Sequence, residues 1–350
     1  MRGERARSYG GRAAVTVAFA CAALLMFVGP AGPATQWRIV PYPSPNGGRL
    51  DAVSCASAHM CFATGGSDSG AFIDRWNGTR WSSIASPGLQ NGYLAGVSCP
   101  TVRFCFAVGY TFQGAGQGVV ERWDGRRWTR QFSKALTNPE TSLLSVSCTS
   151  TTFCMAAGRI YRYQTDADNV FVARWNGHTW SVSENENSNG YDQDWLNGIS
   201  CVSPSSCMAV GYDESPVPPV ALADHWNGQD WTLKRFPNPK PGQAFYSVSC
   251  ATTTYCLASG DPKIERWSRP GGWHDITPPS TAKYGISSVW CSSTISCFGG
   301  GAWANGPDVA HWNGSQWTLV AKASGGNYLS AITCTGSTCL AVGTVALAHE

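Results

Sequence analysis

The chain has 350 residues, of which 43% are hydrophobic and only 13% are charged, and its formal net charge at pH 7 is +3. All of that charge comes from the first 34 residues, which hold four arginines and one glutamate, so the rest has 21 basic and 21 acidic residues. Because no basic stripe remains, we expect neither nucleic acid nor an anionic membrane as a partner.

Residues 1–34 have the pattern of a secretory signal peptide rather than of a folded element. The four arginines precede an apolar run from Ala13 to Val28, and small residues and prolines follow it up to Ala34. The run has 16 residues, fewer than the roughly 20 that a membrane-spanning helix needs. We therefore predict an export signal and a secreted, extracellular protein, with retention of the leader as a membrane anchor as the alternative.

The remaining chain, residues 35–350, repeats one pattern seven times. Each repeat opens with an apolar run that ends on a cysteine, and a second cysteine and then a glycine follow at nearly constant distances. The first cysteines of successive repeats are 41 to 53 residues apart. In six repeats a pair of tryptophans then flanks a turn, usually Asn-Gly or Asp-Gly, as between Trp76 and Trp81. These dipeptides are typical of tight hairpins, so each repeat predicts four short strands.

Four antiparallel strands in a unit of about 40–50 residues indicate a propeller blade, so the sequence predicts an all-β, seven-bladed β-propeller. A β-solenoid is the alternative, although it favours shorter repeats. The seventh repeat stops at Glu350, before its tryptophan hairpin, whereas Trp37 to Pro41 matches the last strand of a repeat. We therefore expect residues 37–43 to complete the last blade, which leaves no unpaired edge between the first and last blades.

The turn from Trp175 to Trp180 resembles the Asp-box turn of bacterial neuraminidase-type (BNR) repeats. The matching residues are Gly177, Thr179 and Trp180, while Trp175 occupies the place of the signature aspartate. In that family the turn joins the third and fourth strands of a blade, which is also its predicted place here. The resemblance implies the architecture of a secreted bacterial propeller and implies no particular activity.

Fourteen cysteines form seven local pairs, each flanking the predicted turn between the first two strands of a repeat. In an exported chain such pairs predict disulfide bonds, each stabilising the fold by roughly 2 kcal/mol through the short loop that it closes. Zinc is the alternative, but no histidine recurs in register to complete a site. The predicted bonds are Cys55–Cys61, Cys99–Cys105, Cys148–Cys154, Cys201–Cys207, Cys250–Cys256, Cys291–Cys297 and Cys334–Cys339.

The repeated tryptophans are expected to pack between neighbouring blades, with a ring of sugar-stacking platforms as the alternative. Six repeats also carry an arginine or histidine before the first tryptophan, for which we predict structural pairing or stacking on an aromatic ring. An arginine cluster for a carboxylate sugar is the alternative reading of these six residues. They are Arg75, Arg122, Arg174, His225, Arg266 and His311.

The longest connections, in the third and fourth repeats, break the pattern with acidic and aromatic residues. Residues 166–214 hold eight of the 22 acidic residues of the chain. A seven-fold scaffold needs none of these side chains, and long loops are often functional, so they form the predicted ligand site, with Trp195 as the stacking group. A solvated loop cluster is the alternative. The candidate residues are Tyr161, Tyr163, Asp166, Asp168, Tyr191, Asp192, Asp194, Trp195, Tyr212 and Asp213.

Carboxylates beside aromatic rings favour a binding module for a glycan or an extracellular protein, which we expect to be a monomer without a cofactor. Calcium is the alternative ligand, since four of the aspartates supply part of the roughly six to eight oxygens that it needs. A glycosidase or polysaccharide lyase with paired carboxylates and a structural scaffold are the other two alternatives. We predict no catalytic residue, because the sequence holds no Ser-His-Asp elbow, phosphate loop or metal triad.

Overall fold

The computed structural model describes most of the chain from residue 36 onward, and residues 35–350 form one compact unit. The described ranges are 36–43, 47–87, 89–112, 116–131, 136, 140–162, 167–184, 194–215, 218–235, 242–261, 263–277, 285–303, 306–322 and 328–349. Within them every regular element is a β-strand. No helix in these ranges is long and apolar enough to cross a membrane.

The strands form seven antiparallel sheets of four strands each, which confirms the predicted blades. Blades 1 and 2 are β2 (Arg49–Ser57), β3 (Met60–Ser67), β4 (Gly70–Trp76) and β5 (Trp81–Ile84), then β6 (Gly92–Thr101), β7 (Phe104–Thr111), β8 (Gly118–Trp123) and β9 (Trp128–Gln131). Blades 3 and 4 are β10 (Thr141–Ser150), β11 (Phe153–Arg162), β12 (Ala167–Trp175) and β13 (Trp180–Glu184), then β14 (Asp194–Ser203), β15 (Ser206–Asp213), β16 (Val220–Trp226) and β17 (Trp231–Arg235).

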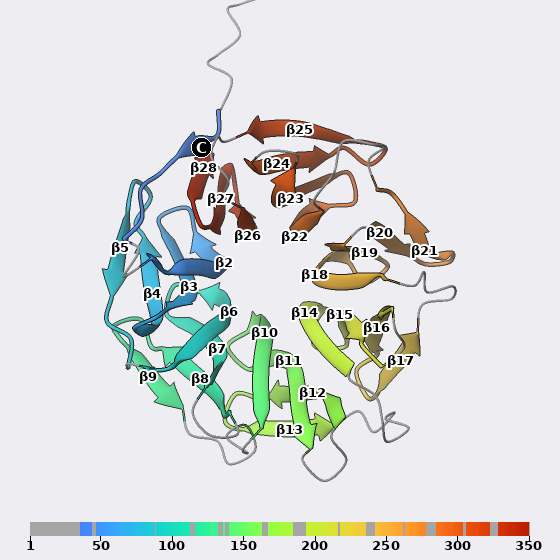
Figure 1. The fold of residues 1–350 in the computed structure, drawn as a ribbon, viewed down its shortest axis with the longest axis horizontal. Helices are drawn as coiled ribbons and strands as arrows, with labels where there is room; N and C mark the ends of the chain where they lie inside the picture. The colour runs from blue at the N-terminus through green and yellow to red at the C-terminus, as the bar shows by residue number, and fades with distance from the viewer. Residues whose placement is uncertain are drawn as a thin grey trace, which may run out of the picture. The chain divides into compact units, whose positions relative to one another are not determined.

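The last three blades follow the same order. Blade 5 is β18 (Ala244–Thr252), β19 (Tyr255–Asp261), β20 (Ile264–Ser268) and β21 (Gly272–Asp275), and blade 6 is β22 (Ile286–Ser293), β23 (Ser296–Trp303), β24 (Gly306–Trp312) and β25 (Trp317–Lys322). Blade 7 is β26 (Leu329–Thr335), β27 (Thr338–Gly343) and β28 (Ala346–His349), with β1 (Arg38–Ile39) as its outermost strand. Figure 1 shows the seven sheets arranged around a central axis, with the first strand of each blade innermost.

The N-terminal strand closes the ring, as the truncated seventh repeat predicts. In β1, Arg38 is paired with Ala348 and Ile39 with Leu347, and the Val40 amide donates to the Ala346 carbonyl at 2.9 Å. Val40 is 3% exposed in the core between blades 7 and 1. The two ends of the described chain therefore meet in one sheet (Figure 1).

Each predicted cysteine pair lies at bonding distance across the turn between the first two strands of its blade. The seven sulfur–sulfur distances run from 1.95 to 2.13 Å. The predicted tryptophan hairpins are also present, and Gly78 has a φ of 99°, the left-handed conformation that favours glycine at such a turn. The side-chain oxygen of Asn77 accepts from the backbone amides of Thr79 and Arg80 at 3.0 Å, which fixes this turn.

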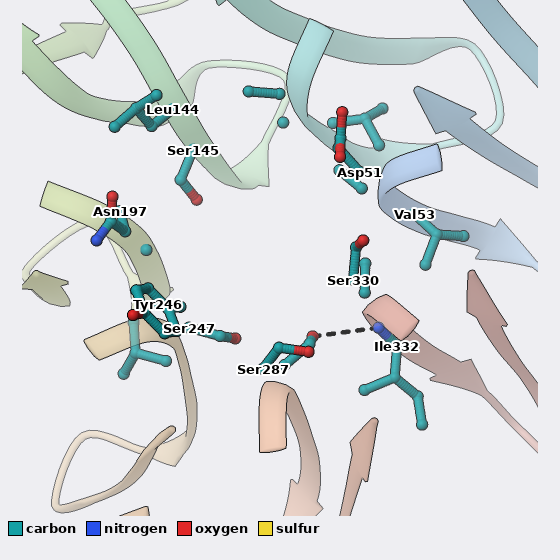
Figure 2. Close-up of a pocket in the computed structure, with 18 of the residues that line it drawn as sticks. Asp51, Val53, Leu144, Ser145, Asn197, Tyr246, Ser247, Ser287, Ser330 and Ile332 are labelled. Atoms are coloured by element: carbon teal, nitrogen blue, oxygen red, sulfur yellow. Dashed lines mark hydrogen bonds between the residues drawn. The ribbon is translucent and has the colours of Figure 1, made fainter. Parts of the chain in front are cut away.

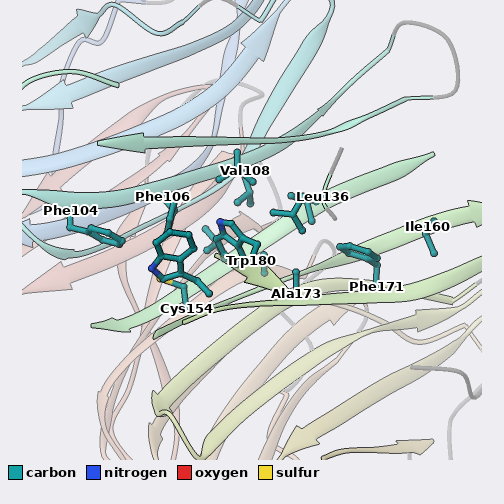
Figure 3. Close-up of a cluster of buried hydrophobic side chains, with 14 residues drawn as sticks. Phe104, Phe106, Val108, Leu136, Cys154, Ile160, Phe171, Ala173 and Trp180 are labelled. Atoms are coloured by element: carbon teal, nitrogen blue, oxygen red, sulfur yellow. The ribbon is translucent and has the colours of Figure 1, made fainter. Parts of the chain in front are cut away.

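The tryptophan pairs pack between blades rather than forming exposed platforms. Phe62 of blade 1 lies with its ring centroid 4.9 Å from that of Trp123 and 5.0 Å from that of Trp128 in blade 2. Phe106 has the same relation to Trp175 and Trp180 one blade further on, within the cluster in Figure 3. The alternative of sugar-stacking rings is therefore wrong for these buried pairs, because neighbouring blades cover them.

The serine that precedes the first cysteine of most repeats links one blade to the next. The Ser54 hydroxyl accepts from the Cys99 amide at 3.0 Å, and Ser98 accepts from the Cys148 amide at 2.9 Å. The same bond recurs from Ser147, Ser200 and Ser249 to the first cysteine of the following blade. The repeated Val-Ser-Cys run thus contributes contacts within a blade and also hydrogen bonds that join neighbouring blades.

Candidate functional site

A β-bulge interrupts the innermost strand of every blade at the same place. In blade 1, Leu50 pairs with Gly65 and Ala52 with Thr64, so the intervening Asp51 is the extra residue. The register shifts in the same way in the other six inner strands. A bulge locally re-aims a side chain out of the alternation of a strand. The seven bulge residues are Asp51, Ala95, Leu144, Asn197, Tyr246, Ser287 and Ser330.

All seven bulge residues line the central channel, together with a ring of β-branched side chains that begins with Val53. Figure 2 labels Asp51, Leu144, Asn197, Tyr246, Ser287 and Ser330 among the residues that surround the channel. The channel cavity has a volume of about 450 Å³. The residue before the bulge is a buried leucine, isoleucine or phenylalanine in every blade, whereas the bulge residue differs greatly between blades. The bulge position is therefore a variable position of the inner strand, as is the position two residues before it, which holds Arg49 in blade 1 and Tyr93 in blade 2.

A second cavity, of about 520 Å³, lies at the mouth of the channel, on the side where the inner strands begin. It shares six lining residues with the channel and adds Tyr93, Tyr110 and Phe112 of blade 2. The Phe112 ring lies edge-to-face with both tyrosines, at centroid distances of 5.1 and 5.5 Å. Phe112 is 54% exposed and Tyr246, from blade 5, is 44% exposed. We call this the mouth cavity; aromatic rings are present on two of its walls.

One ion pair supplies the charge of the mouth cavity. The Arg49 Nε donates to Asp51 Oδ1 at 2.8 Å, and Arg49 Nη1 donates to the Tyr328 hydroxyl at 2.7 Å, so the arginine also links blade 1 to blade 7. Burial raises the pKa of Asp51, and Arg49 acts in the opposite direction. Burial and the nearby Asp51 carboxylate raise the pKa of Tyr110, so its hydroxyl remains protonated at neutral pH.

The predicted site residues Asp168, Trp195 and Tyr212 come together through an arginine that the sequence reasoning did not select. Arg159 donates to Asp168 Oδ2 at 2.8 Å, and its guanidinium carbon lies 3.6 Å from the centroid of the Trp195 ring. Tyr212 stacks beside Trp195 at 5.7 Å with an interplanar angle of 14°. Burial, then the neighbouring Glu214, raise the pKa of Tyr212 to about 12.

The prediction that these residues lie in connecting loops is wrong for all six that the structure describes. Tyr161 lies in β11, Asp168 in β12, Asp194 and Trp195 in β14, and Tyr212 and Asp213 in β15. The hairpin of β11 and β12 continues past the repeated core, pairing Tyr161 with Asp168, and β14 starts before its first cysteine at the same place as β6 and β10 do. Tyr163, Asp166, Tyr191 and Asp192 lie outside the described residues.

Trp195 and Asp194 differ from the exposed binding residues that the sequence predicts. The guanidinium of Arg159 covers the Trp195 ring. Asp194 is 3% exposed opposite Asp213, which is fully buried and accepts bonds from the Ser215 amide and hydroxyl at 2.9 and 2.7 Å. These two aspartates are therefore part of the strand ends of blade 4. Among the described residues, no group of three or more His, Cys, Asp or Glu side chains is placed to hold a metal ion.

The bulge residues do not stand out when the sequence is searched for unusual connecting loops, because they lie inside the innermost strands. Aligning the inner strands on the buried Leu50 position would have exposed the variable column that follows it. That column contains an aspartate, an asparagine and a tyrosine between a column of large apolar residues and a column of alanine, glycine or serine. Variation at positions inside the repeated inner strand is the signal that was available.

Comparison with solved structures supports the propeller fold. The chain is similar to the structure described as YCF48 bound to D1 peptide, with a TM-score of 0.62, 12% identity, and coverage of 91% of this chain and 97% of the other. It is also similar to U3-55K, with a TM-score of 0.64, 10% identity and coverage of 91% and 100%. The WD40 propeller domain of Doa1 gives a TM-score of 0.62 at 9% identity, with coverage of 91% and 97%.

At these identities the similarity defines the architecture alone: the chain is a seven-bladed β-propeller. No protein-family model matches the sequence, and no curated protein sequence matches it either. The class of protein is thus given by the ring of blades, and any function has to be argued from the channel and its mouth.

Proposed function

We propose that the protein is a secreted, non-catalytic binding module that recognises an extracellular ligand, most simply a glycan, at the channel mouth. The observation that carries this proposal is the variable bulge column. Seven equivalent positions, held by the same backbone geometry, present seven side chains to one cavity, whereas the preceding position always holds a large apolar residue and the following one always holds alanine, glycine or serine. Asp51 and Asn197 of this column also make bonds within the frame, and Tyr246 adds a ring that is 44% exposed.

The chemistry of the cavity favours binding over hydrolysis. Glycosidases need two carboxyl groups facing one bond, about 5 Å apart for retention and wider for inversion. Among the described residues that line the channel and its mouth, Asp51 is the only carboxylate, and Arg49 is bonded to it. The mouth therefore offers one neutralised carboxylate beside aromatic rings, which suits recognition of hydroxyl groups.

Export is part of the same proposal. The seven cysteine pairs at bonding distance fit an oxidising compartment, which agrees with the signal peptide predicted at residues 1–34. The relation to neuraminidase-type repeats stays a sequence prediction. A protein partner is the second candidate, because one similar propeller is described as bound to a peptide.

Co-sedimentation with insoluble polysaccharides and with cell-envelope preparations tests the proposal. Tyr246→Ala removes an exposed ring from the mouth and should abolish sedimentation with the ligand. Val102→Ala is the matched control, because Val102 is 47% exposed at the turn between β6 and β7, on the opposite face of the ring. Equal sedimentation of both variants and the wild type would refute a binding site at the mouth, and release of reducing sugar would refute a non-catalytic role.

A further inference from the structure

The charged residues of the mouth cavity indicate the charge of the ligand that it can bind, provided that the proposed binding function holds. Arg49 and Asp51 are the only charged residues among the described residues that line the channel and the mouth, and they are bonded to one another at 2.8 Å. The cavity thus has formal charges of both signs that cancel within one side-chain pair. It has no surplus charge with which to attract an ion.

Displacing either partner of that pair would be costly. The Asp51 side chain is 16% exposed, so a ligand carboxylate that drew Arg49 away would leave a largely buried carboxylate without its donor. A ligand ammonium that bound Asp51 would compete with Arg49 in the same way. Arg49 is further held by the Tyr328 hydroxyl at 2.7 Å, so it does not swing freely toward a ligand.

The uncharged groups of the mouth offer both an apolar platform and hydrogen-bonding partners. Phe112 and Tyr246 are the exposed rings, and a pyranose presents an apolar C–H face of the kind that packs on such rings. Asn197 donates from Nδ2 to the Phe245 carbonyl at 2.9 Å, which fixes the amide plane. Its amide oxygen accepts no bond from the described residues, and the amide lies in the lining of the cavity (Figure 2).

We propose that the mouth cavity binds the uncharged end of a saccharide, with a sugar ring stacked on Phe112 or Tyr246 and its hydroxyls bonded by Asn197 and the Arg49–Asp51 pair. The volume of about 520 Å³ falls within the roughly 300–1,000 Å³ of small-molecule sites. The rigid pair acts as a polar unit that donates through the guanidinium and accepts through the carboxylate. The pair has no net charge, so an acidic sugar or a charged peptide finds no surplus charge here to pair with.

Isothermal titration and a glycan array of the disulfide-intact protein test this. The probes are neutral oligosaccharides of glucose, galactose, mannose and N-acetylglucosamine, uronic-acid oligosaccharides, and lysine-rich and aspartate-rich peptides. We expect a neutral oligosaccharide to bind with a Kd that is the same in low and in high salt, since no charge is screened. Phe112→Ala should raise that Kd about tenfold, equivalent to about 1.4 kcal/mol. Ile295→Ala, at a 65% exposed residue in the turn between β22 and β23, should leave it unchanged.

The outcomes separate the two proposals. Binding of an acidic sugar or a charged peptide that Phe112→Ala weakens would overturn the uncharged ligand while the mouth remains the binding site. Binding of any probe that Phe112→Ala and Tyr246→Ala leave unchanged, or that Ile295→Ala weakens, would overturn the mouth site itself. Failure of every probe to bind would overturn the saccharide inference, and the co-sedimentation experiment then decides the proposed function on its own.

Discussion

Glu121 allows the electrostatics of the blade interior to be tested by the pH dependence of stability. The residue is 1% exposed in β8, and the Ser86 hydroxyl, from the connection between blades 1 and 2, lies 3.1 Å from both carboxylate oxygens. Burial raises the pKa of Glu121 from 4.5 to about 7, although the Ser86 bond and Arg130 act in the opposite direction.

The sign of the effect follows from the higher pKa in the folded state. The folded chain holds the Glu121 proton more tightly than the unfolded chain, so this group stabilises the fold fully below about pH 4.5. The contribution is lost as the pH rises through about 7. A difference of about 2.5 pKa units corresponds to about 3 kcal/mol of the free energy of unfolding.

Urea unfolding followed by tryptophan fluorescence, from about pH 4 to about pH 8, measures this contribution. Glu121→Gln keeps an acceptor for Ser86 but cannot ionise, so its stability relative to the wild type should increase by about 3 kcal/mol across that range. Asp230→Asn, at an exposed carboxylate in the hairpin of blade 4, is the control and should follow the wild type. If Glu121→Gln also runs parallel to the wild type, the carboxyl is not titrating in a buried site and the reasoning fails.

Two further predictions concern the ring itself. Phe62→Ala leaves a cavity between Trp123 and Trp128 and should lower the free energy of unfolding by about 3–5 kcal/mol in the same urea assay, whereas Phe112→Ala should change it little. An unchanged midpoint for Phe62→Ala would contradict tryptophan packing between blades. Deletion of residues 36–43 removes the closing strand and the buried Val40, so the Tm should fall sharply, while Ile39→Ser, at a 58% exposed residue, should keep it near wild type. A stable deletion variant would show that β1 is dispensable.

The fold was predictable because every repeat contains the same local sequence motifs. The cysteine pair, the glycine that follows it and the tryptophan hairpin each define a local hairpin, so seven copies define seven sheets without knowledge of long-range contacts. Even ring closure could be inferred, because the seventh repeat lacks its fourth strand and the segment at Trp37 matches that strand. The role of the serine before the first cysteine of most repeats was not accessible from the sequence, since Ser54 binds a backbone amide in the neighbouring blade.

The site was less predictable for two physical reasons. A bulge shifts the alternation of a strand by one residue, so counting from the start of β2 does not reveal that Asp51 faces the channel. Contacts between blades also join residues far apart in the sequence, as when Arg159 covers Trp195 and turns an expected open platform into a covered ring. Departure from the repeat in the connections pointed to blades 3 and 4, whereas the residues that line the mouth cavity come from five blades.

At each of the seven bulges, a residue outside the pairing ladder lies beside residues of the hydrophobic core. Each bulge residue lies outside the pairing ladder of its blade, whereas Leu50 and Val53 on either side of Asp51 belong to the core. A substitution at one of these positions in the lining of the channel therefore leaves the pairing ladder of its blade intact. Proteins that share this frame would differ in ligand preference through these seven positions together with the mouth residues Arg49, Tyr93, Tyr110 and Phe112.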